Sequence, residues 1–454
     1  MAKYEIDMTR GSMFRNIVRF SIPLILTSLL QLFYNAADVV VVGQFAGKEA
    51  LAAVGSTGAL INLIINLFLG LSVGTSVVVS KLFGAGDERG MQVAVHTSVS
   101  ISAISGIVLL FTGFFLARPL LVLMGNPSDV IDGATLYMKI YFLGMPFNMV
   151  YNFGAAILRA VGDTKRPLYF LSISGVVNVV LNLILVIVFH MGVAGVAIAT
   201  ITSQLISAIF VIRCLMHSEG SVHLDLKKLT IHRKILLEIV RIGLPAGVQG
   251  AMFSISNVLI QSSINSFGSD TVAGNSAAGN LEGFVYVAMN AFHQTIVTFT
   301  SQNLGAKQYK RMHKGFCICI ACVMVIGLVC GNAMYLMRKP LLSIYNGDPN
   351  VIAMGEIRML FILPLYFLCG LMDVVSGQIR GLGYSIMPMI ITLLGACAFR
   401  VAWIYTVFAA FPRLEVLYAS YIISWTLTVA AHYVSYLIVR RKLPKEDMPL
   451  AITP

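Results

Sequence analysis

The chain has 454 residues, of which 57% are hydrophobic and only 11% are charged. A soluble domain has about 25% charged residues, so this composition excludes a water-soluble protein with a single core and favours an integral membrane protein. The net charge of +12 does not indicate nucleic-acid binding, because the basic residues lie in short breaks between apolar runs, where they face anionic lipid headgroups.

The first 20 residues are basic and amphipathic, and the apolar segment after them is too long for a signal peptide, so we expect an uncleaved first helix. A membrane-spanning helix needs about 20 apolar residues. Uncharged runs of that length predict twelve spans, at 17–39, 54–80, 92–117, 134–157, 168–190, 193–215, 242–264, 276–300, 315–337, 356–379, 386–410 and 415–438.

Twelve spans place both termini on one side of the membrane. Of the 32 Lys and Arg residues, 24 fall on that side, 7 fall on the other, and Arg400 lies inside a predicted span. Basic residues concentrate on the cytoplasmic side of membrane proteins, so we expect a multi-pass protein of the cell membrane with both termini in the cytoplasm.

The two halves of the chain carry matching motifs at a nearly constant spacing. Pro23 and Pro245 are 222 residues apart, and LRAVGDTKRP at 158–167 matches IRGLGYSIMP at 379–388 at a spacing of 221. A repeated unit of six spans enters the membrane twice in the same direction. This predicts an all-α integral membrane fold of twelve transmembrane helices, built as two six-helix bundles related by a pseudo-two-fold axis along the membrane normal.

The repeat also divides the chain into parts. We assign residues 1–216 to an N-terminal six-helix lobe and 242–454 to a C-terminal six-helix lobe. The polar stretch 217–241 is expected to be a cytoplasmic linker that includes a basic amphipathic helix on the membrane surface. Within the N-terminal lobe, Gly70 and Gly74 have the small-xxx-small spacing that allows close helix packing.

Several motifs resemble a known family. They are DxxxVG from Asp38 to Gly43, GVAGVAIATITSQ at 192–204, LGA at 304–306, and R-[AG]-x-G at 159–162 and 380–383. Taken in order from about residue 12 to 442, they resemble the multidrug and toxic-compound extrusion (MATE) family. The bacterial branch that includes DNA-damage-inducible and staphylococcal multidrug members is the most similar. The resemblance implies a cation-coupled efflux antiporter with two six-helix lobes.

Asp38 is the one ionised group between Phe20 and Gly47. A carboxylate at the centre of a bilayer costs about 2.5–3.5 kcal/mol, so its presence suggests a group that binds and releases H⁺ or Na⁺. Asn35 lies one turn earlier on the same helix face. The alternative is that Asp38 only ends the first helix near the outer interface.

Two further helices present polar pairs. Asn178 and Asn182 are four residues apart, as are Thr200 and Gln204, so each pair shares one helix face. The resemblance implies that Asp38, Asn178, Asn182 and Thr200 line the cation site of the N-terminal lobe. Many relatives have a second acid where this chain has Asn182. An amide can ligate Na⁺ but carries no proton, which would leave Asp38 as the sole titrating group. Alternatively, the amides only bond neighbouring helices.

The eighth predicted helix carries Glu282, which resembles an acid of this family branch, and His293 lies three turns later on nearly the same face. Both residues could line a central cavity, where Glu282 would attract a cationic substrate or carry a proton. The alternatives are an acid in headgroup water at the outer end of the helix and a histidine that bonds between helices.

Asp373 and Asn152 occupy equivalent positions of the repeat, each seven residues before an arginine, Arg380 or Arg159. A charge in one lobe and an amide in the other suggest that the two residues bind substrate or protons. Alternatively, Asp373 pairs with Arg400, and the two charges are structural. Sequence spacing leaves both open.

The leading hypothesis is an antiporter, coupled to H⁺ or Na⁺, that exports organic and cationic amphipathic compounds by alternating access. We expect a monomer with membrane lipid and a small-molecule substrate as partners, no nucleic acid, no cofactor, and no metal apart from possible Na⁺ at Asp38. No GxxxxGK[ST] or HExxH motif is present, so neither ATP drive nor an enzyme is expected.

The alternative function is that of a flippase or exporter of a lipid-linked or other amphipathic metabolite. It would need a cationic cavity, whereas the charges within the predicted spans are mostly acidic.

Overall fold

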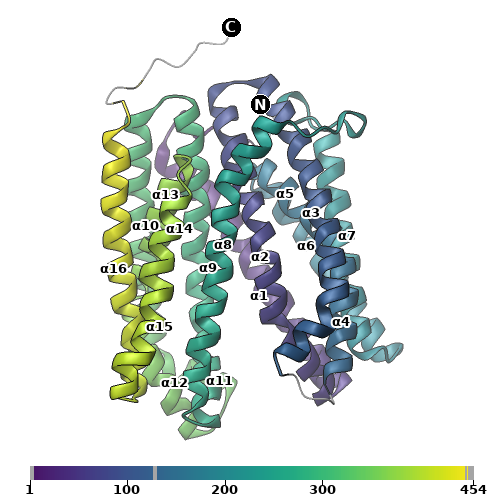
Figure 1. Ribbon diagram of the computed structural model, residues 1–454, viewed down its shortest axis with the longest axis vertical. Helices are drawn as coiled ribbons and strands as arrows, with labels where there is room; N and C mark the ends of the chain where they lie inside the picture. Colours follow the sequence, from purple (N-terminus) through teal and green to yellow (C-terminus); the bar gives the residue numbers. More distant parts are fainter. Residues whose placement is uncertain (1–4, 126–129, 445–446, 448–454) are drawn as a thin grey trace. The chain divides into compact units, whose positions relative to one another are not determined.

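The computed structural model describes residues 5–125, 130–444 and 447, apart from the side chain of Lys48, and the described part of the chain is helical without β-strands (Figure 1). Its α-helices are α1 (Met13–Val41), α2 (Lys48–Ala85), α3 (Glu88–Leu123), α4 (Ile131–Leu143), α5 (Met145–Ala160), α6 (Lys165–Leu183), α7 (Gly192–Met216), α8 (Arg233–Asn265), α9 (Ser269–Gly305), α10 (Tyr309–Leu336), α11 (Arg338–Tyr345), α12 (Pro349–Ile362), α13 (Phe367–Gly381), α14 (Ile386–Thr392), α15 (Phe399–Trp403) and α16 (Leu414–Arg441). Short π-helical or 3₁₀ turns are η1 (Val42–Ala46), η2 (Ile184–Val188), η3 (Gly220–Val222), η4 (Leu226–Lys228), η5 (Leu363–Leu365), η6 (Leu393–Ala398) and η7 (Ile404–Phe408).

The predicted spans fall on these helices. Within the described residues, nine helices are each long and apolar enough to cross a membrane. The predicted span 356–379 is a bent pair, α12 and α13, which meet at 47° across the turn that contains Pro364. The predicted span 134–157 is likewise broken, between α4 and α5, next to Pro146. Proline lacks the N–H that continues a helix, which accounts for both breaks.

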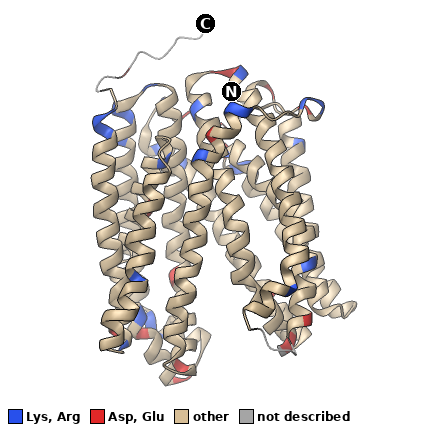
Figure 2. Cartoon of the chain, viewed as in Figure 1, with Lys and Arg blue, Asp and Glu red and all other residues tan. Residues whose placement is uncertain are grey.

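Charged residues lie mainly near the ends of the helices, and the middle of each helix is largely uncharged (Figure 2). This pattern is the one that a bilayer imposes, because ionised groups are costly in its hydrocarbon centre and favourable at its headgroups. The chain is therefore a multi-pass membrane protein.

The chain folds into two compact units, and the boundaries between them lie inside α1 and α8. The first unit contains Met1–Asp7 and Leu26–Gly247, and the second contains Met8–Ile25 and Val248–Pro454. The start of α1 therefore packs within the second unit, where Ser21 Oγ lies 2.7 Å from Thr295 Oγ1 on α9. The start of α8 packs within the first unit. Each repeat thus contributes the beginning of its first helix to the other unit.

Two glycines bring α2 and the start of α8 together in the first unit. A Cβ atom on Gly70 would lie 2.2 Å from the backbone nitrogen of Gly247, and one on Gly74 would lie 2.3 Å from the carbonyl oxygen of Ile239. No Cβ tolerates such distances, so the two backbones touch only because both residues are glycine. The prediction of a close-packing pair is confirmed.

Residues 70–74 read GLSVG, which fits the G-x-S-x-G pattern of serine hydrolases. In those enzymes the serine occupies a sharp turn between a strand and a helix. Here Ser72 lies within α2 and its hydroxyl donates to the carbonyl of Leu69 at 2.7 Å. The motif is therefore part of a packed helix, without the geometry of a nucleophile.

The predicted linker, 217–241, follows α7 and extends into α8. Residues 217–232 form the turns η3 and η4, and the basic residues 233–241 are the first turns of α8. The basic helix expected in this stretch is therefore present as the first turns of α8, which runs without interruption into its apolar part. The linker is held on α3 by two bonds of 3.2 Å, from Asp225 N to His96 Nε2 and from His232 N to Thr97 Oγ1.

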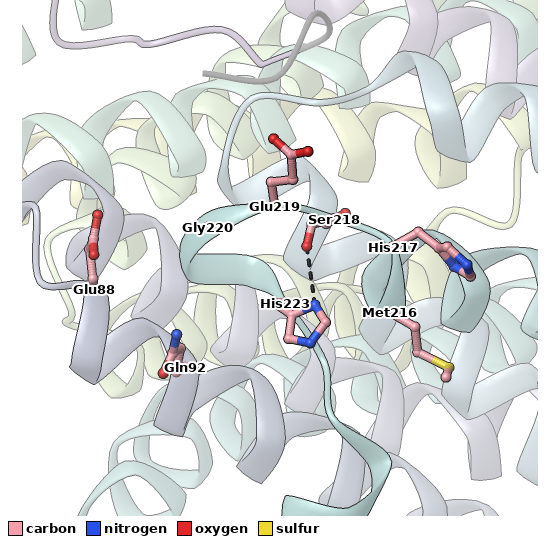
Figure 3. Close-up of a pocket in the computed structure, with 8 residues that line it drawn as sticks. All are labelled: Glu88, Gln92, Met216, His217, Ser218, Glu219, Gly220 and His223. Atoms are coloured by element: carbon pink, nitrogen blue, oxygen red, sulfur yellow. Dashed lines mark hydrogen bonds between the residues drawn. The ribbon is translucent and has the colours of Figure 1, made fainter.

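A surface cavity of about 580 Å³ lies beside this linker, between the start of α3 and the end of α7 (Figure 3). His223 and His217 line it, and His223 Nδ1 donates to the carbonyl of Ser218 at 3.2 Å. Despite these histidines, no group of three or more His, Cys, Asp or Glu is placed to hold a metal ion within the described residues.

Candidate functional site

Asp38 lies in the last turn of α1, where the helix passes into the π-helical turn η1 and ends at Gly47. Gly47 has a φ of 88°, which favours glycine over any other residue. The chain therefore turns at once into α2, and the carboxylate stays in the helix bundle of the first unit. Its side chain is half-buried.

The amides of α6 meet this carboxylate. Asn182 Nδ2 donates to Asp38 Oδ1 and also lies 3.4 Å from Asn178 Oδ1. Asn178 and Asn182 are both buried. Asn182 Oδ1 is also buried and has no hydrogen-bond partner among the described residues. The structure thus brings together three of the four residues expected at the cation site, and it leaves an amide oxygen unsatisfied there.

Tyr34 fixes α1 against α6. A Cβ atom on Gly175 would lie 1.9 Å from the ring of Tyr34, so the ring covers the backbone of α6 at that point. Its hydroxyl donates to the carbonyl of Ser172 at 3.2 Å. Because Tyr34 is one helical turn before Asp38, this contact sets the distance between the carboxylate and the amides of α6.

The other residues predicted for this site have different surroundings. Thr200 Oγ1 donates to the carbonyl of Val196, one turn earlier in α7, at 3.0 Å. Asn35 is exposed. Tyr137 and Tyr141 on α4, by contrast, lie within electrostatic reach of Asp38. No Lys, Arg or His forms an ion pair with Asp38 among the described residues.

In the second unit, Glu282 on α9 forms a two-point ion pair with Arg358 on α12. Arg358 Nε donates to Oε1 at 2.8 Å, and Nη2 donates to Oε2 at 2.7 Å. Arg358 Nη1 also donates to Asn275 Oδ1 at 2.6 Å, and the hydroxyl of Tyr418 donates to the same oxygen at 3.1 Å. The side chains of Arg358 and Glu282 are only 13% and 5% exposed, so this is a buried and well-satisfied pair.

Asp373 on α13 has a different environment. The side chains of Tyr286 and Asn290 on α9 lie within hydrogen-bonding reach of its carboxylate. Its Oδ2 is buried and has no hydrogen-bond partner in the described part of the chain. Its backbone carbonyl accepts a bond of 2.7 Å from His293 Nδ1. The structure therefore places His293 beside Asp373.

His293 leads to a chain of hydrogen-bonded polar side chains, of which Arg380, Thr392 and His432 are buried. Its Nε2 accepts from Arg380 Nη1 at 3.4 Å, and Arg380 Nη2 donates to Gln249 Oε1 at 2.7 Å. Gln249 Nε2 lies 3.3 Å from the hydroxyl of Thr392, which lies 3.1 Å from His432 Nε2. The five side chains come from α9, α13, α8, α14 and α16, so the chain of bonds connects five helices of the second unit.

Arg400 does not pair with Asp373. Its Nε donates to Ser424 Oγ at 2.9 Å, and its guanidinium lies over the rings of Tyr421 and Trp425, at 4.2 and 5.6 Å from their centroids. Of the two possibilities that the sequence left open, the structure therefore favours separate environments. Within the described part of the chain, Asn152, the repeat equivalent of Asp373, bonds only to Asn148 in the same helix, α5.

A profile of the MatE family matches residues 23–184 and 245–406, which together make up more than half of the chain. The chain belongs to the MatE family. The two matched segments begin 222 residues apart, at Pro23 and Pro245, so the family unit occurs twice, as the internal repeat indicates.

Relatives of this MatE protein cover most of its length. The Bacillus subtilis protein named "Probable multidrug resistance protein YpnP" is 27% identical over 396 residues, which are 87% of this chain and 88% of that protein. A MATE crystallised in complex with MaL6 has a TM-score of 0.91 at 24% identity, over 98% of this chain and 100% of that one. A MOP superfamily transporter from Pyrococcus furiosus has a TM-score of 0.91 at 23% identity, over 98% of this chain and 100% of that one. Its description says that the reverse polarity of its binding pocket suggests a different function. These likenesses confirm the predicted twelve-helix, two-bundle fold.

Sequence reasoning missed Arg358 in this MatE protein. It is the third residue of the predicted span 356–379, so close to the beginning of that span that its position alone indicates a cation at the membrane surface. The signal that could have found it is its place inside an apolar segment, where a cation needs a buried partner. The expectation that charges within the spans are mostly acidic is also wrong, because Arg358, Arg380 and Arg400 are all enclosed in the second unit.

Proposed function

We propose that this MatE protein is an antiporter that exports organic, cationic amphipathic compounds by alternating access, driven by the inward movement of H⁺ or Na⁺. The observation that carries the proposal is the Asp38 site. There a membrane-embedded carboxylate, which has no cationic side chain as partner among the described residues, accepts a hydrogen bond from the amide N–H of Asn182, whose own buried oxygen has no partner among them. A coupling ion would satisfy both kinds of oxygen.

The family and the names of its relatives support the class of substrate. The B. subtilis relative is named as a probable multidrug resistance protein, and we extend multidrug efflux to this chain on that basis. The inward movement of one ion per transport cycle supplies enough free energy to drive efflux. A tenfold proton gradient supplies about 1.4 kcal/mol, and the membrane potential adds about 2.3 kcal/mol per charge for each 100 mV.

Further parts of the proposal concern topology. We propose that the protein lies in the cell membrane with both termini in the cytoplasm, on the strength of the 24-to-7 distribution of Lys and Arg residues. We also propose that residues 1–216 and 242–454 act as the two lobes, that 217–241 link them on the cytoplasmic side, and that one monomer is sufficient for transport.

The test is efflux of a fluorescent lipophilic cation from proteoliposomes under a pH gradient or a Na⁺ gradient, imposed separately. Wild type is compared with Asp38→Asn and with a control, Asp132→Asn, which removes an exposed carboxylate from its surface pair with Arg118. We expect one of the two gradients to drive efflux by wild type and the control, and neither to drive it in Asp38→Asn. Equal transport by Asp38→Asn would refute the role of Asp38.

A second candidate is an exporter or flippase for an anionic amphipathic or lipid-linked metabolite. It is favoured by the charges of the second unit, where three enclosed arginines outnumber the two acids, Glu282 and Asp373. The P. furiosus transporter described as having a reversed pocket polarity shares the fold. Competition separates the candidates: an anionic amphiphile that blocks transport, where cations of equal hydrophobicity do not, would favour the second.

A further inference from the structure

A cavity of about 600 Å³ lies in the second unit, between the beginning of α10 and the end of α16. Its wall includes Lys310, Lys314, Arg440 and Arg441, and all four side chains are exposed. Figure 2 shows the blue of basic residues at the end of α16. None of the described residues that line the cavity is acidic. Four cations without an acid among the described lining residues differ from an ordinary solvated helix face, on which charges of both signs alternate.

The floor of this cavity is polar and buried. Gln378 on α13 and Tyr436 on α16 both line it, and they are 1% and 2% exposed. The hydroxyl of Tyr436 lies 3.0 Å from His313 Nδ1, and its ring packs at 4.6 Å from the ring of Phe316. These contacts hold the hydroxyl of Tyr436 in place, so the cavity is lined by buried polar side chains as well as exposed basic ones.

The lysines of the cavity oppose the dipole of α10. A helix begins with a partial positive charge, so acids are favourable in its first turn and cations are not. The first turn of α10 contains no acid, and Lys310 lies in it. An anionic oxygen does occupy the helix end: Asp447 Oδ1 accepts from the backbone N–H of Lys310 at 2.7 Å. None of the four cations forms an ion pair with a carboxylate within the described residues. The site therefore has an excess of positive charge that an anion would neutralise.

We propose that this cavity binds the headgroup phosphate of an anionic phospholipid. It lies at the ends of two membrane-spanning helices, and in the proposed topology these ends are cytoplasmic, where anionic lipids attract basic groups. Basic pockets between transmembrane helices at this depth are typical binding sites for such headgroups. The cavity volume is within the range of small-molecule sites. A free phosphate compound has the same chemistry, so the experiment distinguishes the two sources.

The probes are dioctanoyl phosphatidylglycerol, dioctanoyl phosphatidylcholine and glycerol 3-phosphate, each titrated against the purified full chain in a neutral detergent. Binding is measured by native mass spectrometry and by the shift of the unfolding midpoint. The variants are Lys310→Gln/Lys314→Gln and the same pair combined with Arg440→Gln/Arg441→Gln. The control variant, Lys227→Gln/Lys228→Gln/Arg233→Gln/Lys234→Gln, removes the same four charges from the exposed linker and the start of α8.

We expect wild type and the control to bind phosphatidylglycerol, and the lysine pair variant to bind it at least about tenfold more weakly, since each basic group near the headgroup contributes about fivefold. The lysine pair is decisive because Arg440 and Arg441 also stabilise the end of α16. The proposal is overturned if phosphatidylcholine binds as well as phosphatidylglycerol, or if the control loses as much affinity as the cavity variants. Equal stabilisation by glycerol 3-phosphate would overturn the lipid source and indicate a site for free phosphate compounds.

Discussion

Glu282 and Arg358 are joined at two points, by bonds of 2.8 and 2.7 Å, inside the second unit. Removal of one partner from a buried ion pair leaves an uncompensated charge and costs about 3–5 kcal/mol. We therefore expect Glu282→Gln to lower the unfolding midpoint in detergent by several degrees. Replacement of both by leucine should restore much of the loss, because it leaves no buried charge.

The same pair tests the role of Glu282 in transport. If its carboxylate only binds Arg358, the double leucine variant should still move substrate in proteoliposomes. If that variant folds as stably as wild type but has no transport, Glu282 has the substrate or proton role that its position in α9 suggested.

Asp373 and Arg400 should behave as independent residues. Arg400 is held by Ser424 and by the rings of Tyr421 and Trp425, and no bond joins it to Asp373. Distant sites add within about 0.5 kcal/mol. In a double-mutant cycle of Asp373→Asn and Arg400→Gln, the coupling free energy from unfolding midpoints should lie within that limit. A coupling above about 2 kcal/mol would mean that the two charges pair.

Asn182 should contribute to ion coupling through Asp38. A hydrogen bond to a charged group contributes about 1.5–3 kcal/mol, so Asn182→Leu should weaken the dependence of transport on the coupling ion by about tenfold or more. The measurement is the ion concentration that gives half-maximal efflux. Asn332→Leu is the control, because among the described residues that amide bonds only to the carbonyl of Leu328 in its own helix. An unchanged half-maximal concentration in Asn182→Leu would remove the residue from the site.

Much of the fold follows from the sequence because its signals are local. A run of apolar residues long enough to cross the bilayer identifies a helix, and the fixed spacing of Pro23 and Pro245 identifies the repeat. The exchange of helix beginnings between the two units does not follow, since it depends on which distant helix each half of α1 and α8 packs against. The broken helices were also missed, although Pro146 and Pro364 lie at the breaks.

The contacts at the candidate sites also divide into those that could be predicted from the sequence and those that could not. The contact of Asp38 with Asn182 was implied by the resemblance to the MATE family, and the four-residue spacing added only that Asn178 shares the helix face of Asn182. The partner of Glu282 could not be predicted, because ion pairs between helices depend on their relative rotation, which spacing within one helix does not determine. Arg358 and Arg400 both lie within predicted spans, yet of the two only Arg358 forms an ion pair with an acid in the described part of the chain.

The linker of the first unit should loosen in acid. The backbone N–H of Lys227, with help from Lys228, holds the pKa of Asp225 below its ordinary value. A carboxyl whose pKa is lowered by folding stabilises the fold above its ordinary pKa, and that contribution is lost as the pH falls through the lowered value. Hydrogen exchange at 225–228, corrected for intrinsic rates, should therefore accelerate below about pH 4. Asp225→Asn should remove this dependence, and a pH-independent wild type would contradict it.

Two glycines of α2 should respond oppositely to the same substitution. A Cβ atom on Gly70 would overlap the backbone of α8, whereas Gly58 has nothing within 4 Å of that position. Overpacking costs about 1–3 kcal/mol or more when backbone must move, and alanine in an open helix position gains up to about 1 kcal/mol over glycine. Gly70→Ala should therefore lower the unfolding midpoint in detergent, and Gly58→Ala should raise it or leave it unchanged. Equal midpoints for the two variants would show that α2 and α8 separate at little cost, and that their contact at Gly70 does not stabilise the first unit.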